Sequence, residues 1–285
     1  QSRNPMRNIP FTLFFLAIVL GFGTDLYAQN TLFRQNLDSI GSKEAILILP
    51  GLGDSKKRRM EQISEFSNQG YDVFIPDYMD KDAYVNCLPN LEKYFLENRL
   101  TEYKRLHCFV YIIGGWTLNG YINKHGFQNV ASIVYDRSPP QERAPYVVRT
   151  KLSLIGKLLK GKIVNQFDSI AYVPVDNLVS VNIGIIIENK PTSLIRLFKK
   201  TALEKGPILV DVESLGQSHD DYIYVMLDHN EMYYRFDVIG DEIFYFIKNQ
   251  KFRQYFFITH YNNVAVFSRK ILLGYAQDIL FTYCF

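Results

Sequence analysis

The sequence predicts an α/β fold in three layers, in which helices flank both faces of a mainly parallel β-sheet. Two observations lead to this expectation: short, continuous apolar runs recur along the chain, and segments with helical spacing separate them. Continuous apolar runs are typical of strands that are buried on both faces, and their alternation with helices is typical of parallel sheets. The chain has 285 residues, 47% of them hydrophobic, which is enough for one large domain with a substantial core.

The expected strands are six apolar runs, and we expect the first four of them to be neighbours in the sheet. These runs are residues 45–49, 71–75, 108–113, 130–135, 181–187 and 222–227. Helical spacing follows most of the runs, and a long closing helix ends the alternation. The main expected helices are residues 56–69 with Asp54 or Ser55 as the cap, 81–100 around a break at Pro89, 115–125, and 231–249.

The N-terminus has the features of an export signal. Met6 and Arg7 begin a short basic region, the apolar stretch IPFTLFFLAIVLGF follows, and Ala28 offers a small residue before a cleavage point. We therefore expect residues 1–28 to be a signal-peptide region with translation starting at Met6, and the protein to be periplasmic or secreted. The alternative is that this segment stays on the chain as a membrane anchor.

Composition and motif content narrow the range of functions. The formal net charge of +3 is too small to imply a nucleic-acid partner. The sequence contains no GxGxxG, HExxH or CxxC pattern and no Cys/His cluster, so we expect neither a cofactor nor a metal ion. If the protein is exported, one disulfide among Cys87, Cys108 and Cys284 would leave one free thiol.

Three motifs follow expected strands: LPGLGDS at residues 49–55, GWTLNG at residues 115–120 and LDHNEMY at residues 227–233. Their order and spacing resemble the α/β-hydrolase superfamily, in its lipase and esterase branch, over roughly residues 43–249. The resemblance implies a three-layer α/β-hydrolase-like domain over residues 29–250.

The resemblance also implies roles for residues in the first two motifs. Thr117 stands where the nucleophilic serine of the G-x-S-x-G elbow would be, on a strained turn between a strand and a helix. Leu52 and Leu118 would donate backbone N–H groups to the oxyanion of a tetrahedral intermediate. Gly51 and Gly53 would let the backbone approach that oxyanion closely.

The third motif supplies the general base. His229 follows the last expected strand and precedes the closing helix, where this fold places its histidine. Two acids compete to orient it. Glu188 directly follows the run at 181–187, and Asp211 lies in GPILVDVESL, a segment that resembles an acid-bearing loop of the family.

Two functions from different classes remain open. The first is an exported hydrolase of a small-molecule ester, or of a lipid, with Thr117 as its nucleophile. The second is a catalytically inactive binding protein on the hydrolase fold. The second is favoured by the β-branched threonine, which is poorly suited to a strained turn, and by the absence of a clear acid.

Two segments do not fit the alternation of strands and helices. Residues 144–180 suggest a lid or cap, because residues 144–167 carry five bases and no acid, interleaved with leucine and isoleucine. Such a helix can touch a membrane surface or pack on the sheet with a solvated basic face.

Residues 251–285 form a tail in which ten of 35 residues are Phe or Tyr. We expect it to pack as extra strands or a helix, to dock on a membrane or second subunit, or to be translated noncoding sequence.

Overall fold

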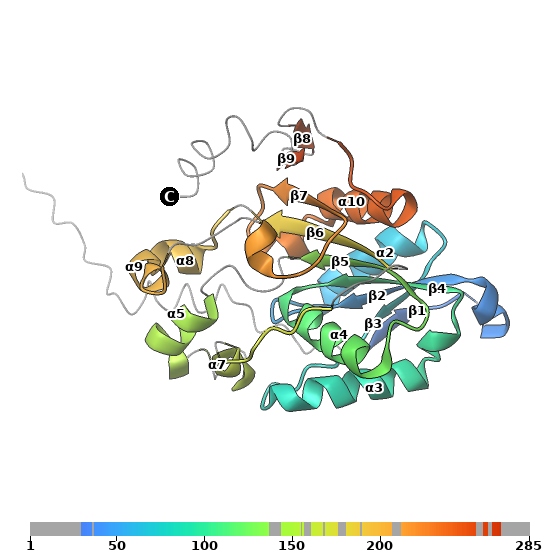
Figure 1. Cartoon of the computed structure of the whole chain (residues 1–285), viewed down its shortest axis with the longest axis horizontal. Helices are drawn as coiled ribbons and strands as arrows, with labels where there is room; N and C mark the ends of the chain where they lie inside the picture. The colour runs from blue at the N-terminus through green and yellow to red at the C-terminus, as the bar shows by residue number, and fades with distance from the viewer. Residues whose placement is uncertain are drawn as a thin grey trace, which may run out of the picture.

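The computed structural model describes residues 30–254, 259–261 and 264–268, with gaps at 36, 137–143, 155, 157–160, 168, 176–180, 189 and 207–211. The described strands form one sheet in the order β1-β3-β2-β4-β5-β6-β7-β9-β8 (Figure 1). Their bounds are β1 Thr31–Phe33, β2 Glu44–Leu49, β3 Asp72–Ile75, β4 Arg105–Val110, β5 Val130–Asp136, β6 Asn182–Glu188, β7 Asp221–Val225, β8 Thr259–Tyr261 and β9 Val264–Ser268.

The six central strands, β3, β2, β4, β5, β6 and β7, are mutually parallel. At the two edges, β1 pairs antiparallel with β3, β9 pairs antiparallel with β7, and β8 pairs antiparallel with β9. This confirms the predicted α/β fold with a mainly parallel sheet. The first four expected strands correspond to β2, β3, β4 and β5, which are neighbours as predicted.

Helices cover both faces of the sheet. One face carries α2 (Lys56–Ser67) and α10 (Phe236–Asn249), and the other carries α3 (Cys87–Glu97) and α4 (Ile112–His125) (Figure 1). Each face has its own large apolar cluster, so the sheet is buried on both sides as its continuous apolar strands require. Ser55 caps α2 by accepting from the Arg58 N–H. Pro89 falls in the first turn of α3, where a missing N–H breaks no helical hydrogen bond.

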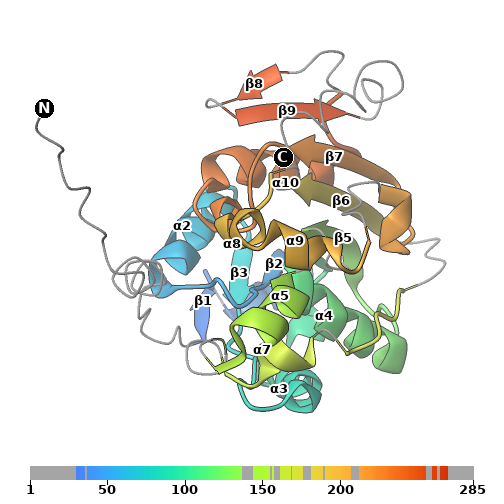
Figure 2. The ribbon, with the colours of Figure 1, turned by 90° about the vertical axis from the view of Figure 1, so that its left-hand side faces the viewer.

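A group of short helices lies at one end of the sheet and forms a cap (Figures 1 and 2). It comprises α5 (Ala144–Lys151), α7 (Ile163–Gln166), α8 (Ser193–Leu197) and α9 (Lys199–Leu203). Val147, Ile195 and Ala202 make its small apolar core. Among the described residues of the basic segment 144–167, α5 ends at Lys151 and α7 begins at Ile163, so the segment is not the single helix that its composition suggests.

The beginning of the C-terminal tail lies against the sheet. Phe252 is 1% exposed and its ring lies 4.7 Å from that of Phe246, while β9 pairs with β7. Residues 269–285 lie outside the described part of the chain.

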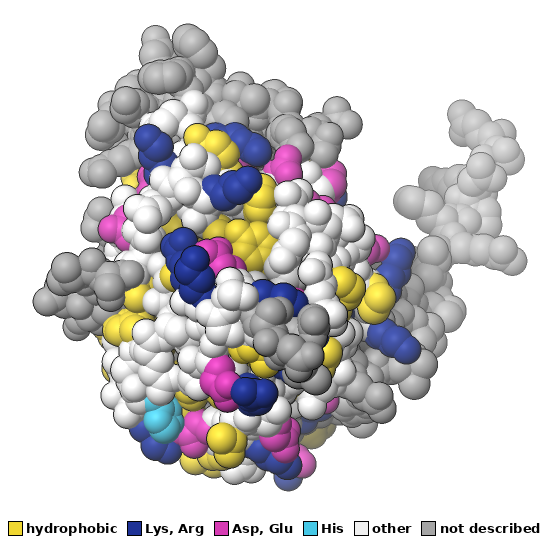
Figure 3. Space-filling model, turned by 90° about the vertical axis from the view of Figure 1, so that its right-hand side faces the viewer, with side chains coloured by type: hydrophobic (Ala, Val, Ile, Leu, Met, Phe, Trp, Pro, Cys, Tyr) yellow, Lys and Arg dark blue, Asp and Glu magenta, His cyan; other side chains and the backbone are white. Residues whose placement is uncertain are grey.

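The signal-peptide region, residues 1–28, also lies outside the described residues. Within the described part, no helix is long and apolar enough to cross a bilayer. Cys87 and Cys108 are buried free thiols, so no disulfide joins these two. On the face drawn in Figure 3, basic and acidic side chains are interspersed without a block of one sign.

Candidate functional site

The candidate site lies at the carboxyl ends of the parallel strands, the edge at which open α/β sheets bind their ligands. The LPGLGDS loop follows β2, and the turn into α4 follows β4. Asp136 is the last residue of β5, Glu188 is the last residue of β6, and His229 follows β7. Because these strands are neighbours, residues far apart in the sequence converge here.

Two buried carboxylates face the imidazole of His229. Nδ1 of His229 lies 2.8 Å from Oε1 of Glu188 and 3.8 Å from Oδ2 of Asp136. The Glu188 and Asp136 side chains are fully buried, whereas that of His229 is 22% exposed. Glu188 thus takes the place of the orienting acid. The other predicted acid, Asp211, lies outside the described residues.

The loop that carries His229 is fixed by its own polar contacts. Oδ1 of Asp228 accepts from the N–H groups of Asn230 and Glu231, at 2.9 and 3.1 Å. The Glu231 carboxylate in turn accepts from Nζ of Lys190, at 2.6 Å, which ties this loop to the segment after β6. These contacts hold the imidazole in one position relative to Glu188.

The turn between β4 and α4 lies earlier in the sequence than predicted. The expected strand at 108–113 ends at Val110, Tyr111 is the cap, and Ile112 is already the first residue of the helix. The ladder to β2 stops because the Tyr111 carbonyl accepts from Gly115 within the helix, at 2.8 Å. The Gly51 N–H, which would continue a parallel ladder, donates to Tyr233 instead.

A glycine in α4 fixes which residue occupies the nucleophile's place. A methyl group at Gly114 would overlap the carbonyl oxygen of Leu49 and lie 2.7 Å from its Cβ, so the helix touches β2 there. In G-x-S-x-G, the glycine two residues after the serine belongs to the same strand-to-helix turn. With Gly114 as that glycine, the motif covers Val110–Gly114, and its nucleophile position is Ile112. Ile112 has no nucleophilic atom.

Thr117 lies inside α4, five residues beyond Ile112, and the predicted strained turn at Thr117 is wrong. Its side chain is 1% exposed, and its hydroxyl donates to the Ile113 carbonyl at 3.0 Å, as helical threonines commonly do. It also lies beside the Tyr84 hydroxyl, whose pKa is raised to about 12 by burial. Among the described positive-φ residues, none lies in this turn.

Leu118 does not occupy an oxyanion-donor position. It is the seventh residue of α4, beyond the first four N–H groups that a helix leaves without an intrahelical acceptor. Its side chain is fully buried in the apolar cluster on this face of the sheet. The physical reason is the same early start of the helix that moves Thr117 away from the turn.

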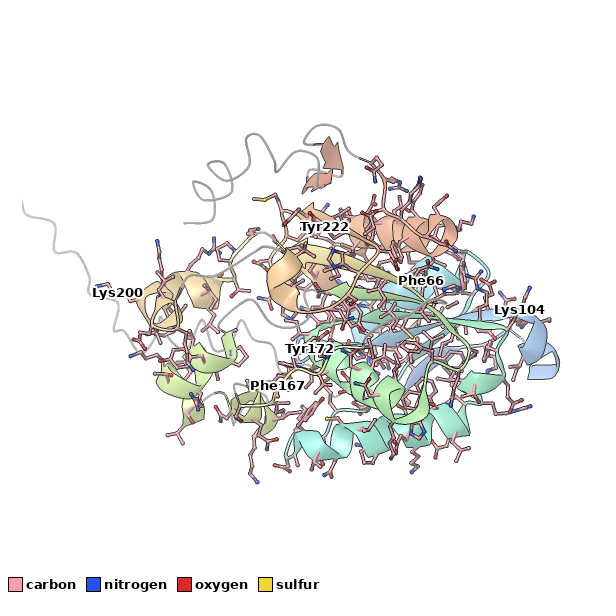
Figure 4. All side chains as sticks on the ribbon, in the orientation of Figure 1. Phe66, Lys104, Phe167, Tyr172, Lys200 and Tyr222 are labelled. Atoms are coloured by element: carbon pink, nitrogen blue, oxygen red, sulfur yellow. The ribbon has the colours of Figure 1, made fainter. Side chains whose placement is uncertain are left out.

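Asn119 has a structural role in this motif. Its Oδ1 accepts from the Tyr135 hydroxyl at 2.6 Å, and its Nδ2 donates to Tyr172, to the Val173 carbonyl and to Gln217. These bonds fasten the segment after α7 to the helix. Figure 4 labels Tyr172 beside α4.

Tyr233 fills the loop that was predicted to hold an oxyanion. The Gly51 N–H donates to the Tyr233 hydroxyl at 3.0 Å. A methyl group at Gly51 would lie 2.5 Å from that hydroxyl, and one at Gly53 would lie 2.8 Å from the same ring. The two glycines therefore make room for a tyrosine of this chain. Leu52, between them, is partly buried against the core.

Tyr233 also connects the loop with the rest of the site. Its ring stacks on Tyr111 at 4.1 Å and meets the His229 ring edge-on at 5.7 Å. Burial raises the pKa of the Tyr233 hydroxyl well above its ordinary value, so it is a neutral hydrogen-bonding group. The loop after β2 is anchored in addition by an ion pair between Asp54 and Arg59, at 2.5 Å. Burial raises the pKa of Asp54, against the lowering effect of Arg59.

Sequence reasoning missed three residues of the site: Ile112, Asp136 and Tyr233. The Gly114-Gly115 pair after an apolar run was the available indication for Ile112. An acid at the end of a buried strand was the indication for Asp136. Tyr233 is 182 residues from Gly51 in the sequence, and nothing local predicts their contact.

The fold matches that of solved hydrolases, whereas no family model and no curated protein sequence matches the chain. A bromoperoxidase from Bacillus anthracis has a TM-score of 0.50 and 11% identity, over 77% of this chain and 95% of that one. A structure from work on carboxylesterases of Nitrososphaera gargenis has a TM-score of 0.49 and 12% identity, over 78% and 94%. The likeness at a TM-score of 0.50, together with the order of the sheet, shows that the chain has the α/β-hydrolase fold, and an identity this low establishes the fold alone.

Proposed function

We propose that this protein is a hydrolase-fold binding protein that forms no acyl-enzyme. The observation that carries the proposal is Ile112 at the strand-to-helix turn, where the fold needs a nucleophile. Tyr233 supports it, because its hydroxyl takes up the Gly51 N–H in the loop where an oxyanion would be stabilised. The ligand class that fits the fold is a small ester or an acyl lipid, held at the carboxyl ends of the strands.

One observation favours a second candidate, an ester hydrolase. The pair of His229 and Glu188 keeps the 2.8 Å contact of a base and its orienting acid. In this version Thr117 would have to leave its hydrogen bond to Ile113 and reach His229, with Leu52 and Leu118 as the oxyanion donors. A direct attack by water activated by His229 is the other route to hydrolysis.

The decisive experiment measures hydrolysis of p-nitrophenyl acetate, butyrate and octanoate by the purified protein, in the presence and absence of EDTA. We expect no turnover above the buffer rate for the wild type, for Thr117→Val or for His229→Ala. Thr117→Val is the matched change at the proposed nucleophile, because it removes the hydroxyl and keeps the branched shape. Binding is measured in parallel as a thermal shift with the corresponding non-hydrolysable ethers, where saturation at about 100 Kd adds about 2.7 kcal/mol to stability.

The outcomes separate the candidates. Wild-type turnover that falls by about 10⁴-fold or more in both Thr117→Val and His229→Ala would establish the threonine hydrolase and refute our proposal. Turnover that is lost only in His229→Ala would indicate attack by water. The absence of both turnover and ether binding would show that the binding function is wrong.

Two further proposals concern location. We propose that residues 1–28 direct export. The test is to fractionate cells that express the chain with or without residues 6–28. Equal amounts of the two chains in the cytoplasm would contradict the proposal. We also propose that the cap contacts a membrane surface, since Leu197 is exposed and the basic residues Arg196 and Lys200 lie close to it in the sequence. Sedimentation with anionic vesicles tests this, and equal recovery with neutral vesicles would contradict an electrostatic contact.

A further inference from the structure

We propose that Asp136, Glu188 and His229 form a binding site for a divalent transition-metal ion. The proposal differs from the sequence expectation of no metal, and it does not depend on whether the protein hydrolyses esters. The three side chains come from the ends of neighbouring strands β5 and β6 and from the loop after β7. One ligand atom from each lies within 4.8 Å of the other two.

The distances suit a common ion. Ligands about 2.1 Å from a metal are about 3.0 Å apart in octahedral and about 3.4 Å apart in tetrahedral geometry. Nδ1 of His229 lies 2.8 Å from Glu188 Oε1 and 3.8 Å from Asp136 Oδ2, two separations that bracket these values, and all three ligand atoms lie within 4.8 Å of one another. Rotation of the two carboxylate side chains toward His229 would bring the three atoms around one ion.

The charge balance points the same way. Two ionised carboxylates with a neutral imidazole carry a formal charge of −2 in a place where both acids are fully buried. A divalent cation carries the equal and opposite charge, so an ion bound among these three ligands would form a neutral site. Buried charge requires such compensation because its desolvation is costly.

The ligand set indicates which ions to test. One imidazole nitrogen with two carboxylate oxygens suits Zn²⁺ and its first-row neighbours, whereas Mg²⁺ and Ca²⁺ prefer oxygen ligands throughout. Three protein ligands also leave at least one coordination position open. The His229 side chain is 22% exposed, so that position can be reached from outside by water or a ligand. The contacts of Asp228 and Glu231 that fix the His229 loop would hold the nitrogen in place before the ion binds.

The test uses the whole purified protein, stripped with EDTA and dialysed against ZnCl₂, with bound zinc measured by elemental analysis. We expect about one ion per chain, and a visible spectrum with Co²⁺ that reports nitrogen and oxygen ligands. Asp136→Asn and Glu188→Gln should each weaken Zn²⁺ binding at least about 10-fold. This is a lower bound, because a loss of about 10-fold is typical even when the mutated residue only hydrogen-bonds to a metal ligand. The control is Asp237→Asn, which removes an equal charge from an exposed carboxylate at the start of α10, outside the three ligands and the loop contacts that fix His229.

Failure of the wild type to bind Zn²⁺ or Co²⁺ would overturn the proposal. So would binding that Asp136→Asn and Glu188→Gln leave unchanged, or that Asp237→Asn weakens equally. If either ligand variant does not fold by circular dichroism, the wild-type Co²⁺ spectrum and its loss in His229→Gln decide. No ester is present in these measurements. An active esterase that binds Zn²⁺ would therefore refute only the proposed function, and an inactive protein that binds none would refute only the metal site.

Discussion

Replacing Gly114 by alanine should destabilise the protein although alanine is the better helix former. The added methyl would lie 2.7 Å from Leu49 Cβ and overlap the Leu49 carbonyl, against an ordinary contact of about 3.5–4.0 Å. The obstacle is backbone of a central strand, so α4 has to move by about 1 Å. Overpacking of this kind costs about 3 kcal/mol at the upper end, and helix propensity returns about 1 kcal/mol, which leaves a net loss of about 2 kcal/mol.

The matched variant is Gly120→Ala in the same helix. Its new methyl would meet Leu88 Cδ2 at 3.6 Å, an ordinary contact, so we expect stabilisation by up to about 1 kcal/mol. Thermal unfolding should show that the midpoint temperature of Gly114→Ala is lowered by about 4–8 °C and that of Gly120→Ala is unchanged or raised. The urea midpoints should shift in the same directions. Equal midpoints would refute the close approach of α4 to β2. They would also remove the argument that places Ile112 at the nucleophile position.

Two more predictions follow from the same geometry. The Ile112→Ser variant should become covalently labelled by a fluorophosphonate, and this labelling should require His229, whereas Thr117→Ser should stay unlabelled. Labelling of Thr117→Ser but not of Ile112→Ser would show that the nucleophile position is residue 117, as the sequence predicted. Truncation after Asn249 should cost about 3–5 kcal/mol relative to truncation after Gln254, because only the longer chain keeps the buried Phe252 ring. Equal unfolding midpoints of the two truncated chains would show that the tail adds nothing to the core.

Much of the fold could be predicted because it depends on local patterns. The run at residues 45–49 is apolar without interruption, which only a strand covered on both faces requires. Ser55 was among the expected caps because its side chain can accept from the backbone three residues on, as it does here. The position of His229 followed from element order alone, and Glu188 followed from its place at the end of a strand.

The nucleophile position could not be predicted because the end of β4 is decided by a long-range contact. Residues 108–113 are β-branched, aromatic or otherwise apolar, so local propensity continues the strand to Ile113. The ladder to β2 would need the Gly51 N–H, but Tyr233 takes that donor from the far end of the domain. The chain therefore turns at Tyr111 and starts the helix three residues earlier than the pattern indicates. The hydroxyl that looked like a nucleophile becomes a buried helical residue, and the residue brought to the turn is an isoleucine. One tyrosine thus accounts both for the shift of the turn and for the filled oxyanion loop.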